Sequence, residues 1–232
     1  MLSLTDSTGR TASRALSYTV TDGTPVSLTF VHGRLFSVEA GETKIVIDGP
    51  LRDAMAFSPT EKARLARAEP PFDRIALALA THENYDHVTP EFVVEHLTSS
   101  RSTLFALLTE TVDLLRCVPG YAAIADRVVG IPFEDGRSAD LYLAGVHVTA
   151  FSVRRGGEGA HLAFLIELCG VKILVLGDAA FDFASAELVA AYGWPGLDID
   201  VAIMSPWWVE TLEGTLVTQG IAPRFVISGP LL

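Results

Sequence analysis

The chain has 232 residues, of which 49% are hydrophobic and 19% are charged, and its formal net charge is −11. A chain of this size buries roughly 70% of its unfolded surface, which excludes a disordered protein and a disulfide-dependent miniprotein. The acidic balance argues against a dedicated nucleic-acid binder, because neutralising phosphates requires a basic surface. The two cysteines imply no disulfide framework, and Cys169 lies in an apolar run that predicts a buried side chain.

No stretch approaches the ~18 unbroken apolar residues that a membrane helix needs, and no basic segment followed by an apolar one opens the chain. We therefore expect a cytoplasmic protein with neither a membrane nor a nucleic acid as its partner. A homodimer is also compatible with the sequence.

The first half of the chain predicts an antiparallel meander followed by strand–helix units. Residues 1–24 are expected to be an extended segment or an edge strand. Ser58, Pro59 and Glu61 have the pattern of a capped helix start, and this helix should end before Pro70. The other elements are expected at 26–31, 35–40 and 44–47 (strands), 75–80 (strand), from 89 onward (helix), 103–107 (strand), 110–117 (helix) and 127–131 (strand).

The second half repeats this order. Its expected elements are strands at 140–143, 146–153, 162–168 and 171–176, a helix at 183–192, and strands at 201–204 and 225–227. Two halves of this kind predict an α/β protein with an αββα sandwich, in which two mixed sheets pack face to face with helices outside. We expect residues 1–232 to form a single domain.

Metal-ligating residue types gather at two places. His82, Asp86 and His87 share one loop directly after the apolar strand at 75–80, and Asp178 ends a later strand. Imidazole nitrogens and carboxylate oxygens are the ligands that zinc and similar divalent metals accept. These residues are therefore candidate metal ligands.

The loop resembles the His-x-His-x-Asp-His motif of the metallo-β-lactamase superfamily, and it reads His-Glu-Asn-Tyr-Asp-His at 82–87. The segments Ile45–Asp48 and Ile173–Asp178 are similar to two strands of that family. The resemblance is nearest to the lactonase-like, metal-dependent hydrolase branch of the family. The resemblance covers about residues 26–230. It implies a metal-dependent hydrolase in which Asp178 is the metal-bridging aspartate.

The sequence departs from this family at three histidine positions. Asn84 stands at the second histidine of the loop, Arg154 or Arg155 stands where a histidine follows the strand at 146–153, and no histidine lies near Pro230. The resemblance therefore implies a degenerate site in which the first metal position is lost. The remaining ligands are His82, Asp86, His87 and Asp178.

Two interpretations of this site are compatible with the sequence. Asp86 and Asp178 would raise each other's pKa unless a cation lies between them. That cation is either one divalent metal, with zinc expected first and manganese or iron as alternatives, or an arginine of the Arg154–Arg155 pair in a metal-free state. His161 is a further residue that could complete a metal site.

The first interpretation predicts a hydrolase of a small ester, lactone, amide or phosphoester, in which Asp86 or Asp178 orients water or accepts its proton. The second predicts a catalytically degenerate protein that binds an anionic small molecule or a protein partner through the two arginines. The candidate substrate-binding residues are Asn84, Arg154, Arg155, His161, Trp207 and Trp208.

Structural alternatives exist for several of these residues. His161 could be an ordinary polar core residue, and Trp207 and Trp208, expected on a loop, could pack in the core instead of covering a substrate. His96 and His147 are expected to be solvated or hydrogen-bonded locally.

Overall fold

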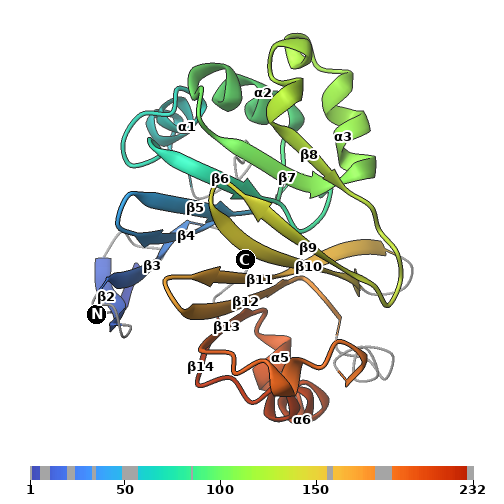
Figure 1. The fold of residues 1–232 in the computed structure, drawn as a ribbon. Helices are drawn as coiled ribbons and strands as arrows, with labels where there is room; N and C mark the ends of the chain where they lie inside the picture. Colours follow the sequence, from blue (N-terminus) through green and yellow to red (C-terminus); the bar gives the residue numbers. More distant parts are fainter. Residues whose placement is uncertain are drawn as a thin grey trace. The chain divides into compact units, whose positions relative to one another are not determined.

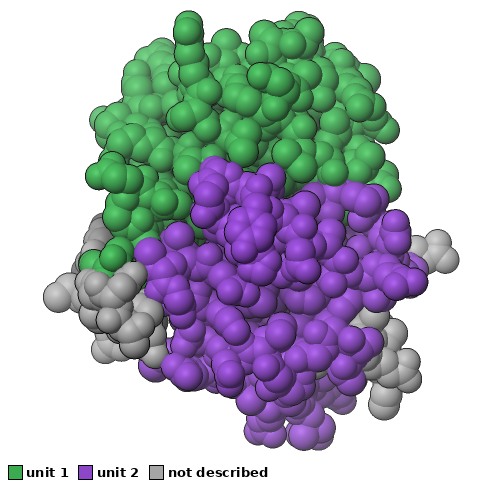
Figure 2. Space-filling model, in the orientation of Figure 1, with its two compact units in different colours: residues 1–130 green, residues 131–232 purple. Residues whose placement is uncertain are grey.

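The computed structural model describes residues 2–5, 11–19, 24–32, 35–48, 57–84, 86–155, 159–180 and 190–228. The chain divides into two compact units, residues 1–130 and 131–232, which are coloured separately in Figure 2. Each unit is built on one β-sheet. A single domain made of two sheets would also divide in this way, so the assignment of one domain to residues 1–232 stays a prediction.

The first unit contains an eight-stranded sheet whose strands follow one another in sequence order. The first five strands are antiparallel, and β5, β6 and β7 are parallel. The expected meander and strand–helix units are confirmed. The strands are β1 (Leu2–Thr5), β2 (Thr11–Thr19), β3 (Pro25–His32), β4 (Leu35–Ala40), β5 (Thr43–Ile47), β6 (Ile75–Leu79), β7 (Leu104–Leu108) and β8 (Val128–Ile131).

Three helices lie together on one side of this sheet (Figure 1), namely α1 (Pro59–Ala66), α2 (Pro90–Ser99) and α3 (Thr109–Arg116). The capping box predicted for α1 is present, because the Ser58 hydroxyl accepts from the Glu61 amide and the Glu61 carboxylate accepts from the Ser58 amide. Leu65 of α1 and Leu97 of α2 pack with Phe105 of β7 in one buried cluster. Burial of these apolar side chains holds the helices against the sheet.

The second unit contains a six-stranded sheet in the order β14-β13-β12-β11-β10-β9. Strands β9 to β12 are antiparallel, and β12, β13 and β14 are parallel, so this unit repeats the order of the first. The strands are β9 (Ser138–Leu143), β10 (Val146–Arg155), β11 (Gly159–Leu168), β12 (Val171–Gly177), β13 (Val201–Met204) and β14 (Phe225–Ser228).

Two further helices, α5 (Trp207–Glu210) and α6 (Leu212–Ile221), follow β13. The expectation that Trp207 and Trp208 lie on a loop is therefore wrong. The structure places them at the start of α5, and Trp208 joins a buried cluster with Phe151 and Met204. Most of the helix expected at 183–192 lies outside the described residues. None of the described helices is both long and apolar enough to cross a membrane.

One smaller expectation also needs correction. Cys169 is not buried but partly exposed, because it lies in the turn between β11 and β12, where it adopts a positive φ of 48°. Of the two alternatives given for His96, the structure agrees with the hydrogen-bonded one, since His96 is only 1% exposed and its Nδ1 lies 2.6 Å from the Leu65 carbonyl oxygen. His147 is partly exposed and lies near the carboxylates of Asp140 and Glu167.

We predict that replacing Gly214 with alanine destabilises the protein by about 1–3 kcal/mol or more. A Cβ at this position would lie 2.4 Å from the Trp207 carbonyl oxygen and 2.7 Å from the Trp208 Cα, and backbone atoms cannot move aside cheaply. The matched control is Gly220→Ala in the same helix, where a Cβ meets nothing within 4 Å. The control should be neutral or stabilising by about 0.5–1 kcal/mol. Equal unfolding free energies for the two variants in denaturant titrations would contradict the prediction.

Burial of His96 should make the protein sensitive to acid. Desolvation lowers the pKa of His96 below its ordinary value of 6.5, opposed by the hydrogen bond to Leu65 and assisted by the charge of Arg127. The unfolded chain therefore binds a proton before the folded one, and the free energy of unfolding should fall as the pH drops below 6.5. His96→Gln cannot titrate, so its unfolding free energy should fall less steeply between pH 6.5 and 5. Parallel curves for the two proteins would refute this account.

Candidate functional site

The site residues of the first unit lie where two parallel strands end side by side. Ile47, at the end of β5, is in register with Leu79 at the end of β6. Asp48 follows β5, and its amide donates to the Leu79 carbonyl with an N–O distance of 2.8 Å. Because neighbouring parallel strands end at the same edge, residues 33 positions apart in sequence meet there.

Asp48 and Thr81 form a buried polar pair at this edge, with exposed fractions of 3% and 0%. The Asp48 Oδ1 accepts from the Thr81 amide at 2.8 Å and from the Thr81 hydroxyl at 2.9 Å. A buried carboxylate is costly unless it is hydrogen-bonded, and these donors supply that compensation. The pair therefore fixes the start of the segment that contains His82 and His87.

The imidazole rings of His82 and His87 are both anchored through Nδ1. The Nδ1 of His82 lies 3.0 Å from the Thr81 hydroxyl oxygen, and the Nδ1 of His87 lies 3.1 Å from Asp48 Oδ2 and 3.2 Å from the same hydroxyl. The hydroxyl has a single proton, which it donates to Asp48, so it accepts from the ring nitrogens. Both Nδ1 atoms then carry hydrogen, and the lone pair of each neutral ring lies on Nε2.

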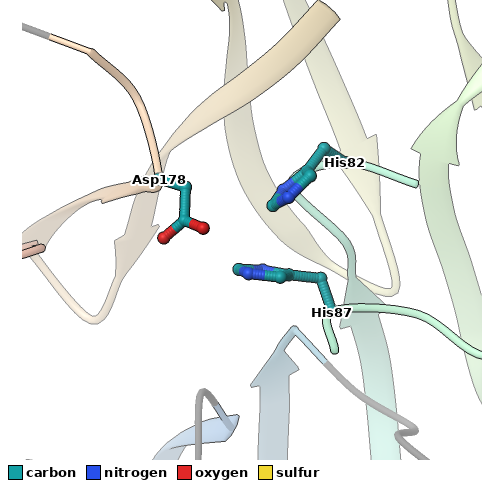
Figure 3. Close-up of side chains that lie close together, drawn as sticks. All are labelled: His82, His87 and Asp178. Atoms are coloured by element: carbon teal, nitrogen blue, oxygen red, sulfur yellow. The ribbon is translucent and has the colours of Figure 1, made fainter. Parts of the chain in front are cut away.

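The two rings lie close together and are 1% exposed each, with centroids 3.9 Å apart and an interplanar angle of 48°. Figure 3 shows them side by side, extending from the same segment of the chain. A histidine that binds a metal through one nitrogen commonly donates its other N–H to a carboxylate or a similar acceptor. His87 with Asp48 has this arrangement.

Asn84 and Asp86 complete the set of predicted residues in the first unit. The Asn84 carbonyl accepts from the amides of His87 and Val88 at 2.8 and 2.9 Å, so Asn84 shapes the turn that carries Asp86. The Asp86 side chain is 48% exposed, and its Oδ2 lies 3.9 Å from Nε2 of His87. The structure thus brings His82, Asn84, Asp86 and His87 together in one turn.

The second unit places Asp178 at an equivalent position. Gly177 at the end of β12 is in register with Met204 at the end of the parallel strand β13. Asp178 follows the first of these strands and Ser205 the second, and the Ser205 Oγ lies 2.7 Å from the Gly177 carbonyl and 3.4 Å from Asp178 Oδ1. The single hydroxyl proton goes to the nearer carbonyl. Asp178 is the third side chain labelled in Figure 3.

The other predicted residues of the second unit contact parts of that unit. Arg154 donates from Nε and Nη2 to Asp135 Oδ2, at 3.1 and 2.7 Å. His161 is 0% exposed, and its Nε2 donates to the Leu176 carbonyl at 2.9 Å, which agrees with the structural alternative for this residue. Arg155 is partly buried at the end of β10. Substrate contacts of the two arginines stay predictions.

Trp207 and Trp208 also contact the segment after β12. Their indole Nε1 atoms both donate to the Ala179 carbonyl, at 3.2 and 3.0 Å. Trp208 is 1% exposed, which agrees with the core-packing alternative, whereas Trp207 is partly buried.

Sequence reasoning missed three residues that support the site, namely Asp48, Thr81 and Ser205. Asp48 was named only as the last residue of a strand that resembles one of the metallo-β-lactamase superfamily. One signal for all three was available: each is the first polar residue after an apolar strand run. Residues at that position end up at the sheet edge where side chains from neighbouring strands meet.

Comparisons with solved structures identify the fold. A protein from Parabacteroides distasonis, named as a metal-dependent hydrolase, matches with a TM-score of 0.63 and 13% identity, over 93% of this chain and 86% of its own. YhfI from Bacillus subtilis, a metallo-β-lactamase fold protein, matches with a TM-score of 0.57 and 9% identity, over 85% of this chain and 78% of its own. The fold is that of the metallo-β-lactamases.

A metallo hydrolase from the archaeon Ignicoccus hospitalis is also similar in structure, with a TM-score of 0.56 and 20% identity, over 88% of this chain and 81% of its own. No protein-family model and no curated protein sequence matches the chain. The fold class expected from the sequence, an αββα sandwich of the metallo-β-lactamase type, is therefore confirmed by structure alone.

We predict that replacing Thr81 with valine releases the imidazole anchoring. The variant keeps the shape of the side chain but removes the hydroxyl between Asp48 and the two rings, which should cost about 1–3 kcal/mol of unfolding free energy. Long-range ¹H–¹⁵N spectra of the histidine rings should show the Nδ1–H form of His82 in the natural protein and a tautomer mixture in the variant. Thr81→Ser retains the hydroxyl and should retain the Nδ1–H form; a mixture in this control would contradict the assigned role.

Proposed function

We propose that the protein is a metal-dependent hydrolase with one divalent ion, bound by His82, His87 and Asp178. The observation that carries this proposal is the double Nδ1 anchoring of His82 and His87, which directs the lone pairs of two buried rings to Nε2. Two imidazole nitrogens and one carboxylate oxygen form a donor set that suits zinc and leaves a position for water. The residues present therefore fit a metal ion.

A single ion is proposed because the residues for a second are missing. Asn84 stands in the turn where the family resemblance expects a histidine, and Arg154 lies near the end of β10 with its guanidinium paired to Asp135. Neither an amide nor a paired guanidinium replaces an imidazole ligand. Zinc is our first expectation, and manganese or iron are alternatives for the same donors.

When bound, the ion would lower the pKa of a water molecule and polarise a carbonyl or phosphoryl oxygen. Within the protein, Asp48 and Thr81 would hold the two rings in place, and Asp178 would supply the anionic ligand. We assign proton acceptance to Asp86, because its carboxylate is half exposed and lies 3.9 Å from Nε2 of His87. A half-exposed acid can exchange its proton with solvent after each turnover.

The proposed substrate is a small ester, lactone, amide or phosphoester. Support comes from the similarity to proteins named as metal-dependent hydrolases and from the net charge of −11, which disfavours long polyanions. The metal-free alternative, in which arginines bind an anionic ligand or a protein partner, has less support because Arg154 already pairs with Asp135. A cytoplasmic location and a homodimer stay predictions.

Elemental analysis of protein purified without chelators tests the proposal directly. We expect about one equivalent of metal in the natural protein. Asp178→Ala should retain little metal and should lose hydrolysis of esters, lactones or phosphoesters in a substrate screen. The matched control is Asp140→Ala, which removes a 72%-exposed carboxylate on β9 and should retain the metal.

Two results would contradict the proposal. One is a natural protein that carries no metal and whose melting temperature does not respond to zinc, manganese or iron, since a ligand of the folded state must raise it. The other is an Asp178→Ala variant that binds metal as the natural protein does.

A further inference from the structure

The short segment that carries Asp178 has its backbone held at several points. The Gly177 carbonyl accepts from the Ser205 hydroxyl at 2.7 Å. The Ala179 amide donates to the Leu176 carbonyl at 3.1 Å, and the Ala180 amide donates to the Arg154 carbonyl at 2.9 Å. A segment beyond the end of a strand is ordinarily held less tightly than the strand itself. Here its polar groups are bonded to three different parts of the unit.

The most unusual of these contacts is at Ala179, the residue after Asp178. Its carbonyl accepts from the indole Nε1 of Trp207 at 3.2 Å and from that of Trp208 at 3.0 Å. A carbonyl oxygen has two lone pairs, and neighbouring side chains occupy both. The peptide that follows Asp178 is therefore fixed in position and orientation.

The backbone of α5, which carries the two indoles, is itself held in place. The Thr211 hydroxyl donates to the Trp207 carbonyl at 2.7 Å, and the Thr218 hydroxyl donates to the Trp208 carbonyl at 3.0 Å. Gly214 lets α6 approach this backbone so closely that a Cβ would meet the Trp207 carbonyl oxygen at 2.4 Å. The two indole N–H donors therefore come from helix α5, which is tied to α6 by hydrogen bonds and close packing.

We propose that Trp207 and Trp208 are positioning residues for Asp178, an inference that rests on the proposed function because it assigns Asp178 as a metal ligand. The two indole N–H groups fix the Ala179 peptide, and this holds the Asp178 carboxylate in the direction required for ligation. Hydrogen-bonding partners behind a metal ligand restrict its orientation and strengthen binding. On this account the tryptophan pair supports the ligand instead of contacting the substrate.

Simple core packing is the competing explanation, and the chain offers a matched control for it. Trp194 is 2% exposed and lies in the same buried cluster as Trp208. Its Nε1 has no hydrogen-bond partner among the residues that the structure describes. Trp194→Phe therefore removes a buried indole from the same core without removing a bond to the Asp178 segment.

The experiment compares the natural protein, the double variant Trp207→Phe/Trp208→Phe, and Trp194→Phe. The dissociation constant for Zn²⁺ is measured by competition with a chromophoric chelator, and the melting temperature is recorded for each protein without metal. We expect the double variant to bind Zn²⁺ roughly 10- to 100-fold more weakly. Trp194→Phe should bind as the natural protein does, even where its melting temperature falls as far. Equal affinity for the natural protein and the double variant, or an equal loss in both variants, overturns the inference.

A metal-free measurement separates this inference from the proposed function. Hydrogen exchange at the Ala180 amide reports whether the segment is held, and it should become faster in the double variant and stay slow in Trp194→Phe. If the natural protein binds no Zn²⁺, the proposed function fails, and unchanged exchange at Ala180 overturns the positioning inference separately. If the double variant does not fold, Trp207→Phe replaces it, because Trp207 is only partly buried and one indole bond is still lost.

Discussion

The candidate site of this protein depends on one constraint of sheet geometry, which is that neighbouring parallel strands end at a common edge. In the first unit β5 and β6 end in register, and Asp48 and Thr81 meet there. In the second unit β12 and β13 do the same for Asp178 and Ser205. Antiparallel neighbours run in opposite directions, so they would place the residues that follow them at opposite edges. The change from antiparallel to parallel pairing within each sheet therefore decides where polar side chains gather.

At the first of these edges, burial and hydrogen bonding work together. A carboxylate that is 3% exposed loses most of its hydration, so Asp48 must obtain its bonds from the protein. It obtains them from the Thr81 amide, the Thr81 hydroxyl and the Nδ1–H group of His87. The same bonds that compensate its burial select the tautomer of two imidazoles. The stability of the buried carboxylate and the orientation of the two rings are in this way determined by a single set of contacts.

Much of the fold could be predicted from the sequence, because apolar runs of strand length alternate with clear turn and capping signals. The Ser58 capping box and the meander at 26–47 are local patterns, and the structure contains both of them. Helix α6 was not predicted because Gly214, Gly220, Thr215 and Thr218 are poor helix formers. Its helical form depends on tertiary contacts, including the hydrogen bond from the Thr218 hydroxyl to the Trp208 carbonyl at 3.0 Å and the burial of Val217 and Ile221 in one cluster with Trp208.

The residues of the candidate site could likewise be predicted where the signal is local, but their long-range contacts could not. His82, Asp86, His87 and Asp178 could be found because their residue types follow apolar strands and match a known motif. The anchoring of the rings could not be found, because Asp48 and Thr81 are 33 residues apart and meet only through the register of β5 with β6. The contact of Trp208 with Ala179 spans 29 residues and likewise depends on the register of β12 with β13. Sequence patterns indicate which side chains could bind a metal or take part in a reaction, whereas the register between neighbouring strands determines which of them are in contact.

The close approach at Gly214 connects a residue outside the candidate site with the backbone that supports that site. This glycine lies in α6, yet the backbone it touches is that of Trp207 and Trp208, whose indoles in turn hold the peptide after Asp178. A side chain at 214 would push on helix α5 and, through two indole hydrogen bonds, on the Ala179 peptide that follows Asp178. Position 214 should consequently tolerate substitution as poorly as a residue of the site, although nothing in its own chemistry marks it as functional.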